Sequence, residues 1–345
     1  MLLDETFMQR GIELALLGQG EVAPNPMVGA VIVYNNKIIG EGYHQKFGEA
    51  HAEVNAINSV LDISVLSEST IFVTLEPCAH FGKTPPCADL IVKHKFKRVV
   101  IGCVDTFSEV KGKGIERMRQ AGIDVTVGCL ENECRELNKH FFTYHEKKRP
   151  FLFLKWAQTL NGKLDSGTHD KTITWISSPE SKTLVHTWRN KHQAILIGRK
   201  TVENDNSSLT IRAISGKNPV RVILDSNLKI PLTYTVFNDE APTIVLNLLK
   251  SEVSHGVEFI QLNEMSPSEI VKALYEKNII SVLIEGGAQT LQSFIDADLW
   301  DEAAVIVGTS SFEKGTNAPL LNSQVNHSFE YFGDTISMYS KTKKL

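Results

Sequence analysis

The chain has 345 residues, 42% hydrophobic and 22% charged, with a formal net charge of −4. This length exceeds that of one ordinary domain, so we expect two. The sequence has no lysine- or arginine-rich run and no apolar run of membrane-spanning length, so we expect neither nucleic acid nor a membrane as partner. The start of the chain lacks the basic region of a signal peptide, and five cysteines do not suggest a disulfide framework. We therefore expect a cytoplasmic protein.

Helical and strand-like patterns alternate through the first part of the chain. Asn35-Asn36 is expected to form a tight turn between the first two strands. Apolar periodicity predicts helices over 5–17, 51–61, 87–94 and 114–121, and strands over 27–34, 37–43, 71–75, 98–104 and 124–127. The polar stretch 131–149 is interpreted as a helix followed by a linker.

A second alternating pattern restarts after Pro150. Strands are predicted over 151–155, 194–198, 220–225, 243–248, 257–261, 281–285 and 303–307, with helices over 178–191 and 266–278. Strands that alternate with helices are typical of α/β folds. We expect two α/β domains, 1–146 and 147–345.

The segment His51-Ala52-Glu53, followed by Pro77-Cys78 and then Cys87, has the composition of a zinc site. One histidine and two cysteines supply three ligands and leave a fourth position for water. Zinc lowers the pKa of bound water, and Glu53 is placed to move the water proton to a leaving ammonia. The order of these residues follows the signature of nucleobase deaminases, although the cysteine spacing is wider.

Two other interpretations of this segment remain open. A closed structural zinc site would need a fourth protein ligand, for which His80 is the nearest candidate. Alternatively, His51 is a core histidine and the cysteines are unrelated to it. The predicted position of both His51 and Cys87 at helix starts favours a metal site, because a helix N-terminus stabilises a thiolate.

Three further residues are candidates for binding the substrate of such a site. His80 and Lys83 lie between the cysteines in a small loop that suits a phosphate or ribose tail; the alternative is a surface loop with an incidental lysine. The amide of Asn25, between two prolines, can recognise both a donor and an acceptor on a pyrimidine edge. Its alternative role is in the turn itself.

These motifs resemble the RibD family of bifunctional riboflavin biosynthesis proteins. The resemblance is carried by Pro24-Asn25-Pro26, by His51-x-Glu53, and by the segment from Glu76-Pro77-Cys78 to Gly82-Lys83-Thr84-Pro85-Pro86-Cys87. It continues through Lys155, Arg189 and Glu285-Gly286-Gly287, so it covers nearly the whole chain.

The resemblance implies a cytidine-deaminase-like α/β/α domain followed by a dihydrofolate-reductase-like α/β domain. The first would deaminate 2,5-diamino-6-(5-phosphoribosylamino)pyrimidin-4(3H)-one, with zinc on His51, Cys78 and Cys87 and with Glu53 as the catalytic residue. The second would reduce the ribose of the product with NADPH to give 5-amino-6-(5-phosphoribitylamino)uracil.

The resemblance also implies positions for the cofactor and the substrate in the second domain. The sequence lacks the common G-x-G-x-x-G fingerprint of dinucleotide sites, and the loop after strand 281–285 is the alternative site for the cofactor phosphates. The implied NADPH positions are Ala157, Trp175, Thr201, Asp205, Ser226, Gly287, Ala288, Gln289, Thr290, Leu291, Gln292 and Ser293. The implied substrate positions are Arg189, Leu209, Arg212 and Glu285. Without the resemblance, each arginine is equally well a solvated surface charge.

Two competing hypotheses come from other functional classes. One is a deaminase of transfer RNA or free nucleosides with an unrelated second domain, which the acidic charge balance disfavours. The other is a non-catalytic module that keeps zinc for stability, which the presence of Glu53 disfavours. We expect a small-molecule enzyme that forms a homo-oligomer.

Overall fold

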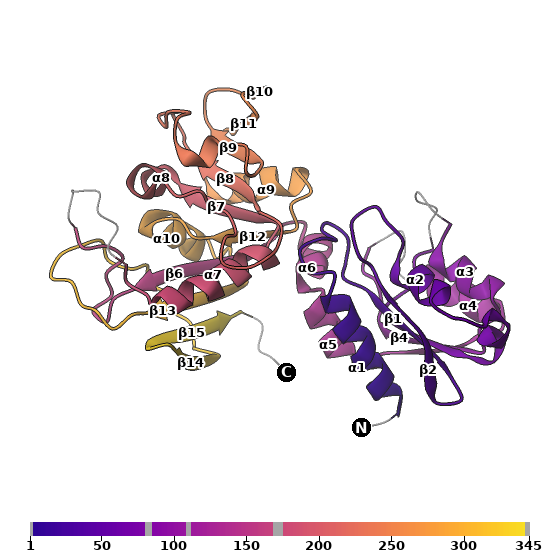
Figure 1. Ribbon diagram of the computed structural model, residues 1–345. Helices are drawn as coiled ribbons and strands as arrows, with labels where there is room; N and C mark the ends of the chain where they lie inside the picture. Colours follow the sequence, from indigo (N-terminus) through magenta and orange to yellow (C-terminus); the bar gives the residue numbers. More distant parts are fainter. Residues whose placement is uncertain (1–2, 80–84, 108–111, 168–174, 342–345) are drawn as a thin grey trace. The chain divides into compact units, whose positions relative to one another are not determined.

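Two β-sheets organise the chain, one in each of two compact units, residues 1–148 and 149–345 (Figure 1). The computed structural model describes residues 3–79, 85–107, 112–167 and 175–341. Each unit is an α/β layer structure with its own hydrophobic cores. The expectation of two α/β folds is therefore confirmed.

The first unit contains a five-stranded sheet in the order β2-β1-β3-β4-β5. Strand β1 is antiparallel to β2 and β3, whereas β3, β4 and β5 are parallel. The strands are β1 (Gly29–Tyr34), β2 (Lys37–Tyr43), β3 (Thr70–Leu75), β4 (Arg98–Cys103) and β5 (Asp124–Val127). The helices are α1 (Leu3–Leu16), α2 (Ala52–Asn58), the 3-10 helix η1 (Ile63–Glu68), α3 (Cys87–Lys93), α4 (Lys113–Gln120), α5 (Glu131–Leu137) and α6 (Lys139–Lys147).

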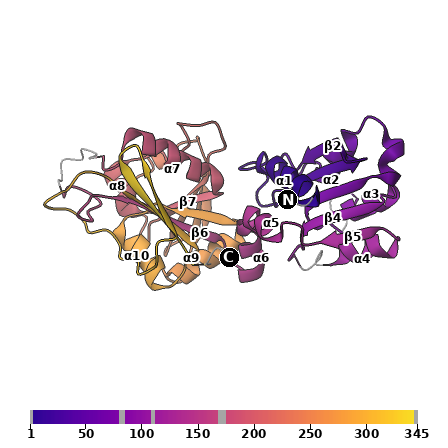
Figure 2. The same ribbon diagram turned by 90° about the horizontal axis from the view of Figure 1, so that it is seen from below.

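Helices cover both faces of this sheet (Figures 1 and 2). Successive side chains of a strand point to opposite faces, so Ala30 and Ile32 of β1 pack with α2, α3 and α4, while Val31 and Val33 pack with α1, α5 and α6. Burial of each aliphatic side chain contributes about 1.5–3 kcal/mol. The side chains of these strands are therefore buried in the core, and we look for reactive side chains at the strand ends.

The second unit contains a ten-stranded sheet in the order β10-β11-β9-β8-β7-β12-β6-β13-β15-β14. The seven strands from β11 to β13 in this order are parallel, and β10, β15 and β14 pair antiparallel at the two edges. The strands are β6 (Phe151–Gln158), β7 (Ala194–Gly198), β8 (Val220–Leu224), β9 (Thr243–Asn247), β10 (Glu252–Ser254), β11 (Val257–Gln261), β12 (Ser281–Ile284), β13 (Glu302–Val307), β14 (His327–Tyr331) and β15 (Asp334–Ser340).

Helices also cover both faces of the second sheet (Figures 1 and 2). The helices are α7 (Pro179–Lys191), α8 (Arg199–Asp205), the 3-10 helix η2 (Thr235–Phe237), α9 (Pro267–Glu276) and α10 (Ala288–Asp296). Leu152 and Leu154 of β6 pack with α9 and α10, whereas Phe151 and Phe153 pack with α7 and α8. The first residues after β7, β8 and β12 therefore lie together at the carboxyl ends of neighbouring parallel strands, in a sheet that helices cover on both faces.

Most predicted elements agree with the structure to within a few residues. The Asn35-Asn36 turn is present, with both residues at positive φ (49° and 59°). Strand β6 extends three residues beyond its predicted end, to Gln158, and the polar stretch after residue 130 forms two helices, α5 and α6. The prediction omitted α8, the edge strands β10 and β14, and β15, which lies next to the edge. These strands carry weaker apolar patterns than the central strands.

Candidate active sites

His51, Cys78 and Cys87 meet in the first unit, although 36 residues separate the first from the last. His51 is the N-cap residue of α2, Cys78 follows the end of β3, and Cys87 is the first residue of α3. The His51 Nδ1 atom lies 3.6 Å from Cys78 Sγ and 3.3 Å from Cys87 Sγ. Three ligand atoms therefore converge from two helix starts and one strand end.

The spacing of these atoms fits zinc. Tetrahedral bonds of about 2.05 Å to nitrogen and 2.3 Å to sulfur imply a nitrogen-to-sulfur distance of about 3.6 Å. The two observed distances lie within a few tenths of an ångström of that value. Within the described ranges, these three residues are the group that could hold a metal ion. His80 and Lys83, the loop residues predicted to contact substrate, lie outside the described residues.

The electrostatics of the site favour a thiolate at Cys78, whereas the hydrogen bond to that sulfur, followed by burial, raises the pKa of Cys87. Hydrogen bonds from the Cys87 thiol and from His51, in that order, lower the pKa of Cys78 to about 4, although burial opposes this. The backbone amide of Cys87 also donates to Cys78 Sγ at 3.3 Å. Cys78 is therefore held as the thiolate, the form that binds metal.

Glu53 lies on α2 beside the ligand atoms and is 3% exposed. Burial, followed by the negative charge of Cys78, raises the pKa of its carboxyl group. A carboxyl group with a raised pKa is suited to taking up and releasing a proton near neutral pH. The position of Glu53 is therefore compatible with the predicted proton transfer.

Asn25 is connected to this site through His44. The Asn25 Nδ2 atom donates to His44 Nε2 at 3.1 Å, and His44 Nδ1 donates to the carbonyl oxygen of Ala50, also at 3.1 Å. The rings of His44 and His51 meet edge to face at 5.4 Å. Asn25 therefore lies near the metal ligands, and His44 is a further polar side chain of the site.

A second polar cluster lies at the end of β12 in the second unit, beside Lys155 in the middle of β6. Glu285, the first residue after β12, accepts two hydrogen bonds from Arg189 of α7, both at 2.9 Å. Lys155 Nζ lies 3.8 Å from the same carboxylate. The side chains of Lys155, Arg189 and Glu285 are only 13%, 11% and 10% exposed, so all three charges are largely removed from water.

The charges of this cluster hold Glu285 ionised. Burial alone would raise its pKa, but the positive charges of Arg189 and Lys155 and the hydrogen bonds from Arg189 outweigh burial and lower the pKa to about 2. Burial lowers the pKa of Lys155, and Glu285 opposes that shift. The cluster therefore combines a fixed carboxylate with a lysine whose proton is more easily released than that of a solvated lysine.

The other predicted substrate positions lie in the loop that packs against this cluster. Arg189 donates to the carbonyl oxygen of Thr210 at 3.1 Å, and Leu209 is buried with a positive φ of 54°. The backbone amide of Arg212 donates to His186 Nδ1 at 3.0 Å. His186 was missed from the sequence; the available signal was its position three residues before Arg189 on the same face of a helix.

A glycine-lined junction follows β7 and β12. The backbone amide of Gly287, the N-cap residue of α10, donates to Thr201 Oγ1 at 3.0 Å. A Cβ atom at Gly286 would lie 3.1 Å from the amide nitrogen of Gly198, and one at Gly198 would lie 2.8 Å from Thr290 Oγ1. Side chains at Gly198 or Gly286 would fill the space between these two loops. The N-cap residue of α10 makes no side-chain capping bond. The junction fits the phosphate groups of a dinucleotide.

The other predicted cofactor positions differ in their solvent exposure and in the residues that they contact. Trp175 is 61% exposed, with Lys182 Nζ 3.4 Å from the centre of its ring. Burial, together with the charge of Asp165, raises the pKa of Asp205. Ala157 lies on β6 and Ser226 two residues beyond β8, both half-buried.

Three predicted cofactor positions of α10 have side chains engaged elsewhere. Leu291 is 1% exposed within the core, Gln292 bonds to Asp296, and Ser293 donates to the carbonyl oxygen of Thr290. Thr290 of α10 lies beside the glycine-lined junction, since a Cβ atom at Gly198 would lie 2.8 Å from its Oγ1 and one at Gly286 would lie 3.2 Å from its Cβ. A role for the three later side chains stays a prediction.

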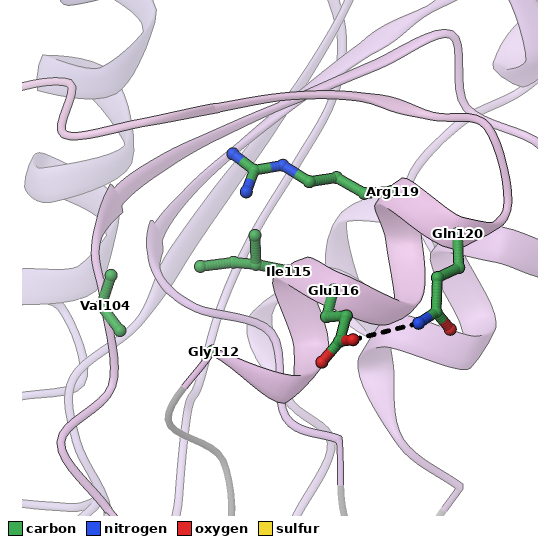
Figure 3. Close-up of a pocket in the computed structure, with 6 residues that line it drawn as sticks. All are labelled: Val104, Gly112, Ile115, Glu116, Arg119 and Gln120. Atoms are coloured by element: carbon green, nitrogen blue, oxygen red, sulfur yellow. Dashed lines mark hydrogen bonds between the residues drawn. The ribbon is translucent and has the colours of Figure 1, made fainter.

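An open pocket beside α4 is lined by Val104, Gly112, Ile115, Glu116, Arg119 and Gln120 (Figure 3). It contains none of the predicted site residues. Among the described residues, no helix is both long and apolar enough to cross a membrane.

Comparison with known proteins gives matches over both units. Residues 1–103 match the family described as cytidine and deoxycytidylate deaminase zinc-binding region, and residues 150–312 match the RibD C-terminal domain. The riboflavin biosynthesis protein RibD of Aquifex aeolicus is 42% identical over 91% of this chain and 89% of its own length. That of Bacillus amyloliquefaciens is 41% identical over 92% and 88%.

Solved structures agree with these matches. The crystal structure of a diaminohydroxyphosphoribosylaminopyrimidine deaminase/5-amino-6-(5-phosphoribosylamino)uracil reductase from Thermotoga maritima has a TM-score of 0.90 and 40% identity, with 98% of each chain covered. RibD of Acinetobacter baumannii has a TM-score of 0.89 and 31% identity, with 99% of each chain covered. The expected cytidine-deaminase-like and dihydrofolate-reductase-like folds, and the expected zinc and NADPH, are confirmed. With a zinc-binding deaminase unit followed by a reductase unit along the whole chain, the protein belongs to the RibD family of bifunctional riboflavin biosynthesis enzymes.

Proposed function

We propose that the first unit deaminates 2,5-diamino-6-(5-phosphoribosylamino)pyrimidin-4(3H)-one and that the second reduces the ribose of the product to give 5-amino-6-(5-phosphoribitylamino)uracil. The observation that supports this most directly is the convergence of His51, Cys78 and Cys87 at zinc-like distances beside the buried Glu53. Similarity to the Thermotoga maritima enzyme, which is named for both reactions, supports the choice of substrate.

In the deamination, His51, Cys78 and Cys87 would hold zinc, which lowers the pKa of water and so supplies a nucleophile near neutral pH. Glu53 accepts the water proton and returns it to the amino group that leaves as ammonia. Its burial removes competing solvent, so the carboxylate is available for this transfer. Asn25, oriented by His44, contacts the polar edge of the pyrimidine.

The loop between the cysteines would bind the rest of this substrate. In our proposal, His80 and Lys83 contact the phosphoribosyl tail, since a lysine ammonium is a compact partner for phosphate. This part of the proposal rests on the sequence alone.

In the reduction, NADPH supplies the reducing equivalents, and the protein supplies position and charge. Thr201, Gly287 and the first turn of α10 would bind the cofactor phosphates, with Ala157, Trp175, Asp205 and Ser226 around the rest of the cofactor. Glu285 is held as a carboxylate at the end of β12 and contacts the substrate from there.

The two arginines have different roles in this proposal. The guanidinium of Arg189 is already paired with Glu285 and with the carbonyl oxygen of Thr210, so it fixes the carboxylate. The side chain of Arg212 is exposed beside the same cluster, while its backbone is anchored by His186. A planar guanidinium in this position suits the substrate phosphate, and Leu209 shapes the loop between them.

We infer the kind of partner and the cellular compartment from the charge of the chain and the state of its cysteines. The substrate is a small molecule, and the net charge of −4 without a basic stripe disfavours nucleic acid. All five cysteines are unpaired, as expected in the reducing cytoplasm. We also infer a homo-oligomer, because soluble proteins that assemble usually do so as symmetric homo-oligomers.

A coupled assay with the purified, zinc-loaded protein tests both reactions. Ammonia release and NADPH consumption are measured separately, with the diaminopyrimidine substrate or with the deaminated intermediate. We expect Cys87→Ser to abolish ammonia release and zinc retention, while NADPH consumption from the supplied intermediate persists. Cys103→Ser, which changes a buried cysteine on β4 outside the metal group, is the matched control for the loss of a thiol.

Two results would contradict the proposal. If transfer RNA or free nucleosides were deaminated in preference to the diaminopyrimidine, the substrate assignment would be wrong. If folded Cys87→Ser protein lost both activities, the sites would not act independently.

A further inference from the structure

A buried carboxylate lies two residues before Cys78 and takes no part in the chemistry proposed above. Glu76 is the first residue after β3 and is 3% exposed. Its two oxygens accept hydrogen bonds from four backbone amides. The donors are Gly112 at 2.9 Å and Asp105 at 3.3 Å to Oε2, and Gly114 at 3.0 Å and Ile115 at 3.3 Å to Oε1. Bonds from amides to a charged carboxylate are stronger than bonds between neutral groups.

These donors connect Glu76 to the start of α4. The N-cap residue of α4 is Gly112, which has φ of 79° and no side chain with which to cap the helix. Glu76 supplies the cap from 36 residues earlier in the chain, and its negative charge lies at the positive end of the helix dipole. The end of β3 and the first turn of α4 are therefore held together by one side chain.

The backbone next to Glu76 is enclosed as well. A Cβ atom at Gly114 would lie 2.2 Å from the carbonyl oxygen of Pro77, so the first turn of α4 lies against that peptide. On the other side, the carbonyl oxygen of Cys78 accepts from the amide of Ala88 at 3.1 Å, and Cys78 Sγ accepts from the amide of Cys87 at 3.3 Å. The segment 76–78 is thus fixed between the first turns of α4 and α3.

We propose that Glu76 is a positioning residue that sets the metal-binding geometry of Cys78 by anchoring the segment 76–78 to α4. The proposal rests on the zinc ligand set proposed above. The nitrogen-to-sulfur distances in that set match zinc to within a few tenths of an ångström, so a small displacement of residue 78 misplaces the sulfur. Residues that support metal ligands without touching the metal typically change metal affinity by about 10–100-fold when altered.

The variant Glu76→Gln tests this role because it keeps the size of the side chain and replaces one acceptor oxygen with an N–H donor. We expect zinc to bind about 10–100-fold more weakly, as measured by competition with a chromophoric chelator. We also expect a shifted sulfur-to-cobalt charge-transfer band in the Co²⁺-substituted protein. NADPH consumption from the supplied deaminated intermediate should be unchanged, which shows that the second unit is folded.

The matched control is Glu116→Gln. Glu116 lies in the first turn of the same helix but is exposed, and it accepts a hydrogen bond from Gln120 at 3.1 Å (Figure 3). This substitution removes the same charge from the same helix without touching the segment 76–78. We expect it to keep the parent zinc affinity and the parent cobalt spectrum.

Two further measurements keep the proposal testable if Glu76→Gln does not fold. Gly114→Ala leaves the carboxylate in place but forces α4 away from Pro77, and we expect it to weaken zinc binding in the same direction. In the parent protein, removal of zinc should speed hydrogen exchange at the amides of Gly114 and Ile115, because coupling between two sites is reciprocal.

A folded Glu76→Gln protein with lower thermal stability but with parent zinc affinity and cobalt spectrum would overturn the proposal and leave Glu76 a purely structural residue. Unchanged exchange at Gly114 and Ile115 on zinc removal would overturn it as well. A parent protein that binds no zinc would instead contradict the ligand set itself, so the two failures are distinguishable.

Discussion

The two sites of this chain are built on similar sheet ends but are stabilised in different ways. In the first unit, the supporting bonds come mainly from backbone amides of helix first turns, as at Glu76 and at Cys78 Sγ. In the second unit, the site is held by buried charges of opposite sign, Arg189 and Lys155 around Glu285. The first arrangement places ligand atoms for a metal, and the second keeps one carboxylate ionised. Substitutions should therefore alter metal binding or proton transfer in the first unit and the pairing of buried charges in the second.

The largest effect is expected for Glu53→Gln in the first unit. Loss of a positioned proton-transfer group costs about 10²–10⁴-fold in rate, so ammonia release should fall by that factor. Zinc content should stay at the parent value, since the ligands are untouched, and NADPH consumption from supplied intermediate should persist. Steady-state kinetics with metal analysis measures both. Unchanged ammonia release would show that Glu53 does not carry out the proton transfer.

Arg189→Ala should have a comparable effect in the second unit, but on folding rather than on one chemical step. It leaves Glu285 buried without its principal partner, and removal of one member of a buried ion pair costs about 3–5 kcal/mol. Chemical denaturation followed through the second unit measures this loss. Arg199→Ala is the control, because Arg199 and Glu203 are about one-third exposed and such surface pairs contribute about 0–1 kcal/mol. Equal losses in the two variants would refute the distinction between the sites.

The acid dependence of stability should also distinguish the units. The pKa of Glu285 is lowered from 4.5 to about 2 in the folded chain. A depressed pKa contributes stability above the unfolded value, so the contribution is complete above pH about 4.5 and is lost as the pH falls toward 2. The free energy of unfolding of the second unit should decline more steeply over this window in the parent than in Glu285→Gln. Parallel pH profiles would show that the ion cluster does not hold Glu285 ionised.

The smallest effect is expected for Gln158→Ala, near the proposed cofactor site. Gln158 accepts a hydrogen bond from the indole Nε1 of Trp156 at 2.8 Å. Loss of one such bond typically costs about 0.5–1.5 kcal/mol, and NADPH affinity should change little if the residue serves only Trp156. Thermal unfolding and NADPH titration separate the two effects. A large loss of NADPH affinity would instead place Gln158 in direct contact with the cofactor.

Local signals in the sequence were sufficient for much of the fold. The strands β5, β7 and β11 were predicted with the bounds that the structure gives. Strand β7 is a short apolar run, whereas β5 and β11 mix apolar and polar residues, and each lies between turn residues or helices. The edge strand β14 was not predicted, because its residues are mostly exposed and carry no apolar run. Strand β15 was missed because only two of its residues, Asp334 and Ile336, are buried, so its apolar pattern is weak.

The two sites differed in how far the sequence alone could define them. Residue types and order were sufficient to predict the set His51, Cys78 and Cys87, because few combinations of ligands suit zinc. The partnership of Arg189 with Glu285 spans 96 residues, and nothing local to either residue indicates it. The positions in the second unit therefore depended on the family resemblance, and the support that Glu76 gives to Cys78 became visible only in three dimensions.

Three acids that are largely removed from water occupy the same place relative to a strand. Glu76, Asp225 and Glu285 each come directly after the last residue of a parallel strand, namely β3, β8 and β12. One is bound by amides of another helix, one accepts from the amide of Ile230, and one is paired with an arginine. An acid at the end of a strand therefore recurs in this fold. Its hydrogen-bond or ion-pair partner decides whether the acid supports the structure or contacts a substrate. A change of the partner residue changes the role of the acid and leaves the strand before it unchanged.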